Sequence, residues 1–160
     1  MTEAAAAFED DAERIPDSAI LYRRVDWDKI GGRDKYPPGA TGTLNGNCFT
    51  DYPEWRALEM GLPGPCMSVG VAPILTGHGH GPEKMLEDWE GYGLAWIRAG
   101  DLRMLERADK SPCPQGIMLF PTADEPWHGV VFDHAERPRK GAVCKAIARV
   151  AGWEIALVNE

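Results

Sequence analysis

The residues with the clearest chemical potential lie in DEPWHGVVFDH, Asp124 to His134, where a histidine begins an apolar run. Histidine titrates near neutral pH and can therefore act as a general base or acid. On a strand, His128 and His134 would share one face but lie too far apart to bind one metal ion directly. We therefore treat His128 as a candidate catalytic residue, with a structural histidine at a strand end as the alternative.

Two arginines and a serine complete the set of catalytic candidates. Arg23 and Arg24 occur in LYRRV, and successive strand residues face opposite sides, so one of them is expected to reach the interior or a cleft. A buried guanidinium needs a carboxylate or a ligand phosphate, and a structural ion pair is the alternative. Ser68 lies in CMSVGV, which lacks the G-x-S-x-G pattern of a nucleophile elbow and carries no motif that links the serine to a histidine.

The segment HGHG contains a weak candidate for a metal site. An H-x-H pair such as His78 and His80 projects both imidazoles to one side when the chain is extended, which metal sites can use. No third ligand with a recognised spacing follows, so the sequence favours an exposed loop and predicts no metal. The glycine clusters GGR and TGTLNGN match no phosphate-binding fingerprint, and the cofactor stays unknown.

A basic stretch and a tryptophan are the candidate binding residues. RPRKGAVCKAIAR contains no acid and could bind an acidic partner or nucleic acid, but the sequence favours a solvated helix face. Tryptophans are frequent anchors of protein cores and interfaces. The binding candidates are Trp127, Arg137, Lys145 and Arg149.

Length and composition indicate one α+β domain. A chain of 160 residues can bury one sizeable core, and 18 Gly with 13 Pro predict many turns. We expect residues 1–15, an alanine run with several acids, to form a flexible N-terminal tail. Residues 16–160 are expected to form a single compact domain with a small mixed sheet, three or four short helices and long loops.

The periodicity of apolar residues places the main elements. Strands are expected over 19–25, 66–72 and 129–133, and apolar residues at helical spacing predict a helix through Val143 and Val150. A further helix is expected over 99–110. WEIALV, after the predicted helix, is expected to be a strand, which gives β-α-β order at the end of the chain.

Charge and cysteine usage restrict partners and location. A net charge of -8 makes binding to nucleic acid or to an anionic membrane unlikely, because phosphate groups repel an acidic protein. The four cysteines include no C-x-x-C pair, no apolar run is long enough to span a membrane, and the acidic N-terminus does not resemble a signal peptide. These features predict a cytoplasmic protein.

The succession of IPDSAILYRRV, CFTD, MSV and DEPWHGVV resembles a family of small uncharacterised bacterial proteins with an early L-x-R-R-V strand and a late P-x-H-[AG]-x-V motif. The resemblance implies one ordered domain and no particular activity. LYRRV is also similar in type to ADP-ribosyltransferase-like folds, in which a first-strand arginine holds NAD, but a Ser-Thr-Ser strand and a catalytic glutamate motif are missing.

Two functions follow from these observations. The first is a protein-binding module that acts beside a partner protein through its tryptophan-bearing loops or its basic helix. The alternative is a small enzyme that uses His128 and an arginine of LYRRV on a nucleotide or another phosphate-containing substrate. The sequence leaves the partner, the substrate and the oligomeric state open.

Overall fold

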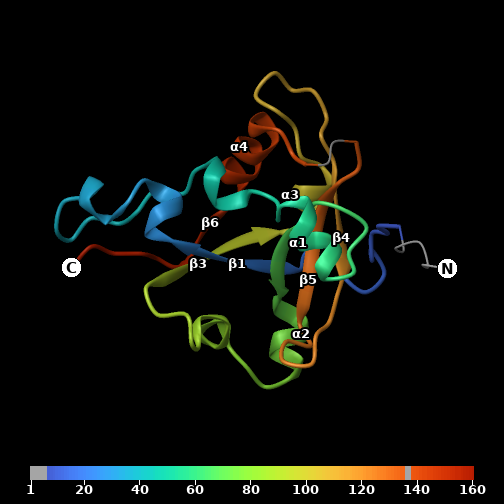
Figure 1. Ribbon diagram of the computed structural model, residues 1–160, viewed down its shortest axis with the longest axis horizontal. Helices are drawn as coiled ribbons and strands as arrows, with labels where there is room; N and C mark the ends of the chain where they lie inside the picture. The colour runs from blue at the N-terminus through green and yellow to red at the C-terminus, as the bar shows by residue number, and fades with distance from the viewer. Residues whose placement is uncertain (1–6, 136–137) are drawn as a thin grey trace.

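The computed structural model describes residues 7–135 and 138–160, which form a six-stranded sheet with helices on both faces (Figure 1). The strand order is β4-β5-β2-β1-β3-β6, and every pair of neighbours is antiparallel. The strands are β1 (Ile20–Asp26), β2 (Met67–Val71), β3 (Tyr92–Arg98), β4 (Gln115–Leu119), β5 (His128–Asp133) and β6 (Gly152–Ile155).

The predicted α+β class is confirmed, but the prediction of a mixed sheet is wrong. The β5-α4-β6 segment would give a parallel pair if its two strands were neighbours. Instead β6 pairs antiparallel with β3 at the opposite end of the sheet from β5.

None of the helices in the described part of the chain is both long and apolar enough to cross a bilayer. The α-helices are α1 (Glu54–Glu59), α2 (Ala72–Gly77), α3 (Ala99–Arg103) and α4 (Gly141–Val150).

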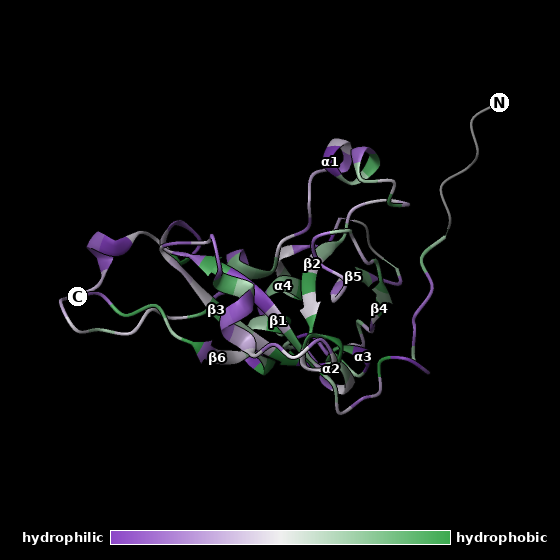
Figure 2. Cartoon of the chain, turned by 90° about the horizontal axis from the view of Figure 1, so that it is seen from below, coloured by the Kyte–Doolittle hydropathy of each residue, from purple (hydrophilic) through white to green (hydrophobic). Residues whose placement is uncertain are grey.

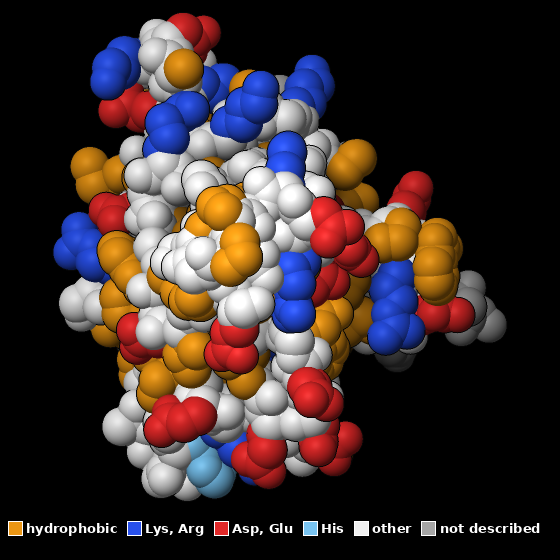
Figure 3. Space-filling view, turned by 90° about the vertical axis from the view of Figure 1, so that its left-hand side faces the viewer, with side chains coloured by type: hydrophobic (Ala, Val, Ile, Leu, Met, Phe, Trp, Pro, Cys, Tyr) orange, Lys and Arg blue, Asp and Glu red, His pale blue; other side chains and the backbone are white. Residues whose placement is uncertain are grey.

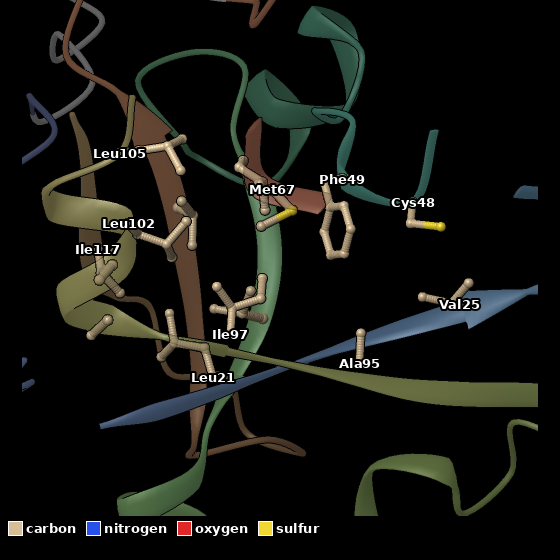
Figure 4. Packing of buried hydrophobic residues seen from close by; sticks show 14 of the residues in the cluster. Leu21, Val25, Cys48, Phe49, Met67, Ala95, Ile97, Leu102, Leu105 and Ile117 are labelled. Atoms are coloured by element: carbon tan, nitrogen blue, oxygen red, sulfur yellow. The ribbon is translucent and has the colours of Figure 1, made fainter. Parts of the chain in front are cut away.

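One face of the sheet packs against α4 and the short 3-10 helix η3 (Gly46–Phe49) and contains the largest hydrophobic cluster. Leu21 and Val25 point to this side from β1, as strand alternation requires, and Ile97 joins them from β3. Figure 4 shows these side chains together with Phe49 from η3. The predicted helical pattern of Val143 and its neighbours on α4 is confirmed, because its apolar residues are buried here.

The opposite face carries a smaller cluster under α2 and the 3-10 helix η4 (Pro82–Leu86), which lie below the sheet in Figure 1. Tyr22 of β1, Met85 of η4 and Trp127 form this cluster with Leu75 and Leu94. Arg24 lies on the same side of β1 as Tyr22, because the two residues are two positions apart. The guanidinium of Arg24 therefore lies beside this smaller cluster, hydrogen-bonded to the carbonyl of Met85.

Residues 7–15 contact the domain, although they belong to the predicted flexible tail of residues 1–15. Phe8 stacks on Phe132 of β5, with ring centroids 4.7 Å apart. Asp10 forms a 2.9 Å ion pair with Arg103, and Ile15 is fully buried. These contacts are those of a domain segment, and the remainder of the predicted tail, residues 1–6, lies outside the described residues.

The glycine-rich loop after β1 contains two 3-10 helices, η1 (Trp27–Ile30) and η2 (Arg33–Lys35). This loop extends to the left of the sheet in Figure 1, beside the C-terminal segment. The side-chain amide of Asn159 donates a 2.6 Å hydrogen bond to the carbonyl of Tyr36, which joins the two segments.

The helix predicted over 99–110 ends at Arg103, because Glu106 pairs with Pro112 in a short antiparallel bridge instead.

Replacing Tyr22 with Phe is expected to make the fold less sensitive to alkali. Burial, with a hydrogen bond to Glu154, raises the pKa of Tyr22 to about 12. The unfolded tyrosine titrates near 10, so the unfolded state loses its proton first and stability falls as pH rises from about 10 to 12. The difference is roughly 1 kcal/mol at pH 11. Denaturant unfolding at pH 8 and pH 11 measures it, and an equal loss of stability in Tyr22→Phe and the parent would contradict this account.

Candidate functional site

The candidate site lies where the two central strands separate. β1 and β2 share only two paired positions, Leu21 with Val71 and Tyr22 with Gly70, whereas β1 pairs with β3 along its whole length. Beyond Tyr22 the side chain of Arg23 replaces direct strand pairing. Its Nη1 donates a 2.9 Å hydrogen bond to the carbonyl of Ser68.

Arg23 also binds η3 and the residue that follows it. Its Nε donates a 3.1 Å hydrogen bond to the carbonyl of Cys48, and Nη2 lies 3.4 Å from the carbonyl of Thr50. Burial lowers the pKa of this guanidinium, and its hydrogen-bond acceptors are backbone carbonyls. Arg23 therefore holds β2 and the η3 loop at a fixed distance from β1, which keeps the gap between the strands open.

A cavity of about 190 Å³ occupies this gap. Its wall combines aromatic rings, charged groups of both signs and one serine hydroxyl, which is the composition of a small-molecule site. Arginine and lysine suit anionic groups of a ligand, whereas the rings suit a planar or apolar group. The lining includes Tyr22, Tyr52, Trp89 and Tyr92, the charged residues Arg23, Arg24, Asp26, Lys29 and Glu125, and Ser68.

A serine–histidine pair lies at this cavity. The Oγ of Ser68 is 2.6 Å from Nε2 of His128, and Nδ1 of the same ring is 2.8 Å from the carbonyl oxygen of Phe120. A carbonyl only accepts, so Nδ1 carries the proton and Nε2 of the neutral ring accepts the hydrogen bond from Ser68. Burial lowers the pKa of His128, which keeps the imidazole neutral at pH 7. This arrangement is suited to removing the proton of Ser68.

The sheet register brings these two residues together from 60 positions apart. Ser68 is opposite Val130, and Gly70 is opposite His128, so serine and histidine are diagonal neighbours on one face. A Cβ at Gly70 would lie 2.5 Å from Sδ of Met85, which shows that glycine permits Met85 to pack onto β2 beside the pair. Because Gly70 has no side chain, Met85 can cover β2 next to His128.

Arg24 provides a positive charge on the face of the sheet that carries this pair. Extending the Tyr22–Gly70 register by two residues places Arg24 opposite Ser68. Its Nε donates to the carbonyl of Met85, its Cζ lies 4.4 Å from the centre of the Trp89 ring, and Nη2 is 3.4 Å from the Glu125 carboxylate. The long contact with Glu125 is a weak one, and it leaves guanidinium donors available to a ligand.

The structure brings three of the four catalytic candidates into one site. Ser68 and His128 are hydrogen-bonded, and Arg24 shares the cavity with Ser68. Arg23 also reaches the cavity wall, but its hydrogen bonds to backbone carbonyls give it a structural role. The group that orients the imidazole of His128 is the carbonyl of Phe120.

Of the four binding candidates, Trp127 differs most from the prediction, because only 5% of its surface is exposed and its ring belongs to the smaller core cluster. Arg137 lies outside the described residues. Lys145 and Arg149 are exposed on α4. Figure 3 shows Lys and Arg side chains near the top of the molecule, the part that contains α4 and the α3–β4 loop in Figure 1. Lys145 lines a separate cavity beside η3.

The histidines of the HGHG segment pack against Trp127. Their rings meet the indole edge-to-face, with centroids 6.1 Å away for His78 and 5.5 Å for His80. Within residues 7–135 and 138–160, the structure contains no group of three or more His, Cys, Asp or Glu side chains placed to bind a metal ion. The two histidines thus act as aromatic cover for the smaller core cluster.

Sequence reasoning missed the aromatic and acidic lining of the cavity, including the two groups that contact Arg24, Glu125 and Trp89. Glu125 was visible three residues before His128, but nothing local indicated that it approaches Arg24, which is 101 positions away. Trp89 lies in EDWEGYG, and its position over Arg24 depends on how η4 crosses the sheet. Both residue types are recognisable in the sequence, but nothing local indicates that Trp89 and Glu125 each contact Arg24.

Comparison with known proteins identifies no matching family model, no matching curated protein and no matching solved structure. The resemblance to a family of small bacterial proteins therefore stays a prediction. Functional inference has to come from the cavity and its side chains.

Proposed function

We propose that the protein is a small group-transfer enzyme that acts on a nucleotide or another phosphate-containing substrate at the cavity between β1 and β2. The observation that carries this proposal is that Ser68, which lines one aromatic-lined cavity together with Arg24, is hydrogen-bonded to His128 behind it. A neutral histidine can take a proton from a hydroxyl, and a nearby guanidinium can bind phosphate oxygens. The enzyme alternative is thus preferred to the protein-binding module.

Several side chains at the cavity suit the parts of a nucleotide. Arg24 presents guanidinium donors that suit phosphate oxygens, and its flat face rests on the Trp89 ring, which restricts its orientation. Tyr52 and Tyr92 offer aromatic surface for a base. The Glu125 carboxylate can accept hydrogen bonds from ribose hydroxyls once a phosphate takes its place on Arg24.

NAD is the first nucleotide to test. The sequence similarity to ADP-ribosyltransferase-like folds implies that a first-strand arginine holds this dinucleotide, and Arg24 on β1 lines the cavity. Glu125, which enters the cavity just before β5, supplies a carboxylate that no sequence motif had indicated. In this proposal the group transferred is the ADP-ribosyl unit and nicotinamide is released.

Titration calorimetry with NAD, ADP and adenosine, followed by chromatographic detection of nicotinamide release, tests the proposal. We expect NAD and ADP to bind at least about 10-fold more tightly than adenosine, because only they carry phosphate for Arg24. His128→Ala is expected to lower turnover by about 100- to 10,000-fold while binding persists. Failure of all three compounds to bind would overturn the proposed function.

A protein-binding role is the second candidate, and exposed apolar side chains on α1 favour it. Trp55 and Leu58 are 64% and 58% exposed, and α1 stands away from the sheet in Figure 2. Tryptophan is enriched among the residues that dominate interface energetics. We also propose a cytoplasmic location, because Cys48, Cys66 and Cys144 are buried thiols outside any disulfide, as expected in a reducing compartment.

A further inference from the structure

We propose that Ser68 is a nucleophile that forms a covalent adduct during the reaction, with His128 as its general base. This inference concerns the same cavity as the proposed function, but it does not depend on which nucleotide binds there. The alternative is that the Ser68–His128 hydrogen bond only fixes the β2–β5 register. Geometry, access and surrounding charge separate these two roles.

The geometry aligns the base with the hydroxyl. The 2.6 Å separation of Oγ and Nε2 is short for a hydrogen bond to a neutral ring nitrogen, and the carbonyl of Phe120 fixes the tautomer through Nδ1. The Phe120 ring also meets the imidazole edge-to-face, with centroids 6.1 Å apart. A base that is fixed on its far nitrogen loses little freedom when it accepts the proton.

Access differs for the two members of the pair. Ser68 is half-buried and lines the cavity, whereas only 6% of the surface of His128 is exposed. A substrate in the cavity therefore meets the serine oxygen, while solvent water has little contact with the imidazole. A hydrogen bond that served only to hold two strands would not need its hydroxyl to face a cavity.

The charge that develops during attack also has a partner. Arg24 is opposite Ser68 in the extended register, and its guanidinium can stabilise negative charge on oxygens of the group under attack. Asp26 and Glu125 on the same wall carry the opposite sign, but Glu125 already faces Arg24. Arg24 therefore supplies positive charge on the wall that carries the nucleophile.

The proposed step balances without a further reagent. Ser68 Oγ forms a bond to the electrophilic atom of the substrate while its proton moves to Nε2 of His128. The leaving group departs with the electron pair of the broken bond, and because nicotinamide leaves as a neutral ring, the proton stays on His128. When an acceptor hydroxyl or water attacks the adduct, His128 returns this proton to the Ser68 oxygen and the acceptor releases its own proton to solvent, which restores the serine and the neutral histidine. A basic leaving group would take the proton from His128 instead, and the acceptor's proton would then pass through His128 to Ser68.

Labelling with sulfonyl fluorides tests this inference without a nucleotide. In this reaction the serine oxygen replaces fluoride on sulfur, and the hydroxyl proton leaves through His128. We expect phenylmethanesulfonyl fluoride or the smaller methanesulfonyl fluoride to modify Ser68, as read by mass spectrometry of the intact protein and of its peptides. His128→Gln is expected to slow labelling at least about 100-fold, and thermal unfolding checks that this variant is folded.

Ser111 offers a matched control. It is half-buried like Ser68 and its Oγ also makes a 2.6 Å hydrogen bond, but to the carboxylate of Asp109. Hydrogen bonds from Ser111 lower the pKa of that carboxyl, which makes it a weak base. Ser111→Ala should leave labelling unchanged, and Ser68→Ala should abolish it.

The pH dependence of labelling gives a second readout. Because burial lowers the pKa of His128, the rate should stay high at neutral pH and fall only below the ordinary histidine value near 6.5. Labelling of Ser68 no faster than of Ser111 with both reagents, or a rate unchanged in His128→Gln, would overturn the inference. Nucleotide binding without labelling would refute the nucleophile alone, whereas labelling without nucleotide binding would refute the proposed substrate alone.

Discussion

Replacing Asp51 with Ala is expected to destabilise the protein by about 3–5 kcal/mol, because a buried arginine then loses its carboxylate. The side chains of Asp51 and Arg139 form an ion pair, with exposed fractions of 4% and 0%. The other oxygen of Asp51 accepts a 2.7 Å hydrogen bond from the backbone N–H of Arg139. A loss of this size is a large part of the 5–15 kcal/mol that usually stabilises a domain.

The ion pair belongs to a buried network that joins the β1–β2 connection and the β5–α4 connection to the sheet. Arg139 donates from Nε to the side-chain carbonyl of Gln115 at 2.7 Å and from Nη2 to the backbone carbonyl of Val131 at 2.6 Å. Gln115 in turn donates to the carboxylate of Asp133 at 2.8 Å. The segment before α4, the loop after η3 and strands β4 and β5 are thus held by one set of polar contacts.

Denaturant unfolding of Asp51→Ala measures this effect, with Glu54→Ala as the control for loss of an exposed acid in the same segment. Glu54→Ala is expected to change stability by less than about 0.5 kcal/mol. The double variant Asp51→Ala with Arg139→Met should be less destabilised than the sum of the two single changes, because no unpaired charge remains. A loss of unfolding free energy below about 1 kcal/mol in Asp51→Ala would show that the ion pair does not stabilise the fold.

Replacing Arg24 with Ala is expected to weaken nucleotide binding by about 10- to 100-fold, which corresponds to the loss of a charge-assisted contact with phosphate. The guanidinium is positioned by Met85, Trp89 and Glu125, so a ligand meets it in a fixed orientation. Arg24→Lys keeps the charge but loses the flat, forked donor set. It should therefore bind with intermediate affinity.

Calorimetry with ADP measures the effect of Arg24→Ala, and Arg56→Ala is the matched control. Arg56 is an exposed residue of α1 that pairs with Glu59, so its removal changes the net charge equally without touching the cavity. Salt should weaken binding less in Arg24→Ala than in the parent, because a charged contact is already missing. Equal affinities of Arg24→Ala and Arg56→Ala would remove Arg24 from the binding site.

The elements that the sequence predicted well are those with a strong local pattern. The helix at Gly141–Val150 follows from apolar spacing, and the strand at His128–Asp133 follows from an uninterrupted apolar run. Prediction failed where a longer-range pairing decided the outcome. The helix expected over 99–110 stops at Arg103, because residues 106 and 112 form a bridge that helical propensity cannot anticipate.

The basic stretch near the C-terminus shows a second limit of local reasoning. Lys145 and Arg149 are exposed, as a solvated helix face requires, but Arg139 from the same stretch is buried against Asp51. Residue type alone does not distinguish them, because a guanidinium is stable in either place if a carboxylate is available inside the fold. The carboxylate that decides the case is 88 positions earlier in the chain.

The sequence by itself determined the α+β class, the strand that carries each catalytic candidate and the position of His128 at the start of a buried strand. These features depend on apolar periodicity, which is a property of neighbouring residues. Only the tertiary structure paired Ser68 with His128, placed Arg24 beside them and buried Trp127. Strand order and register decide those contacts, and both are set by how the whole sheet buries its faces.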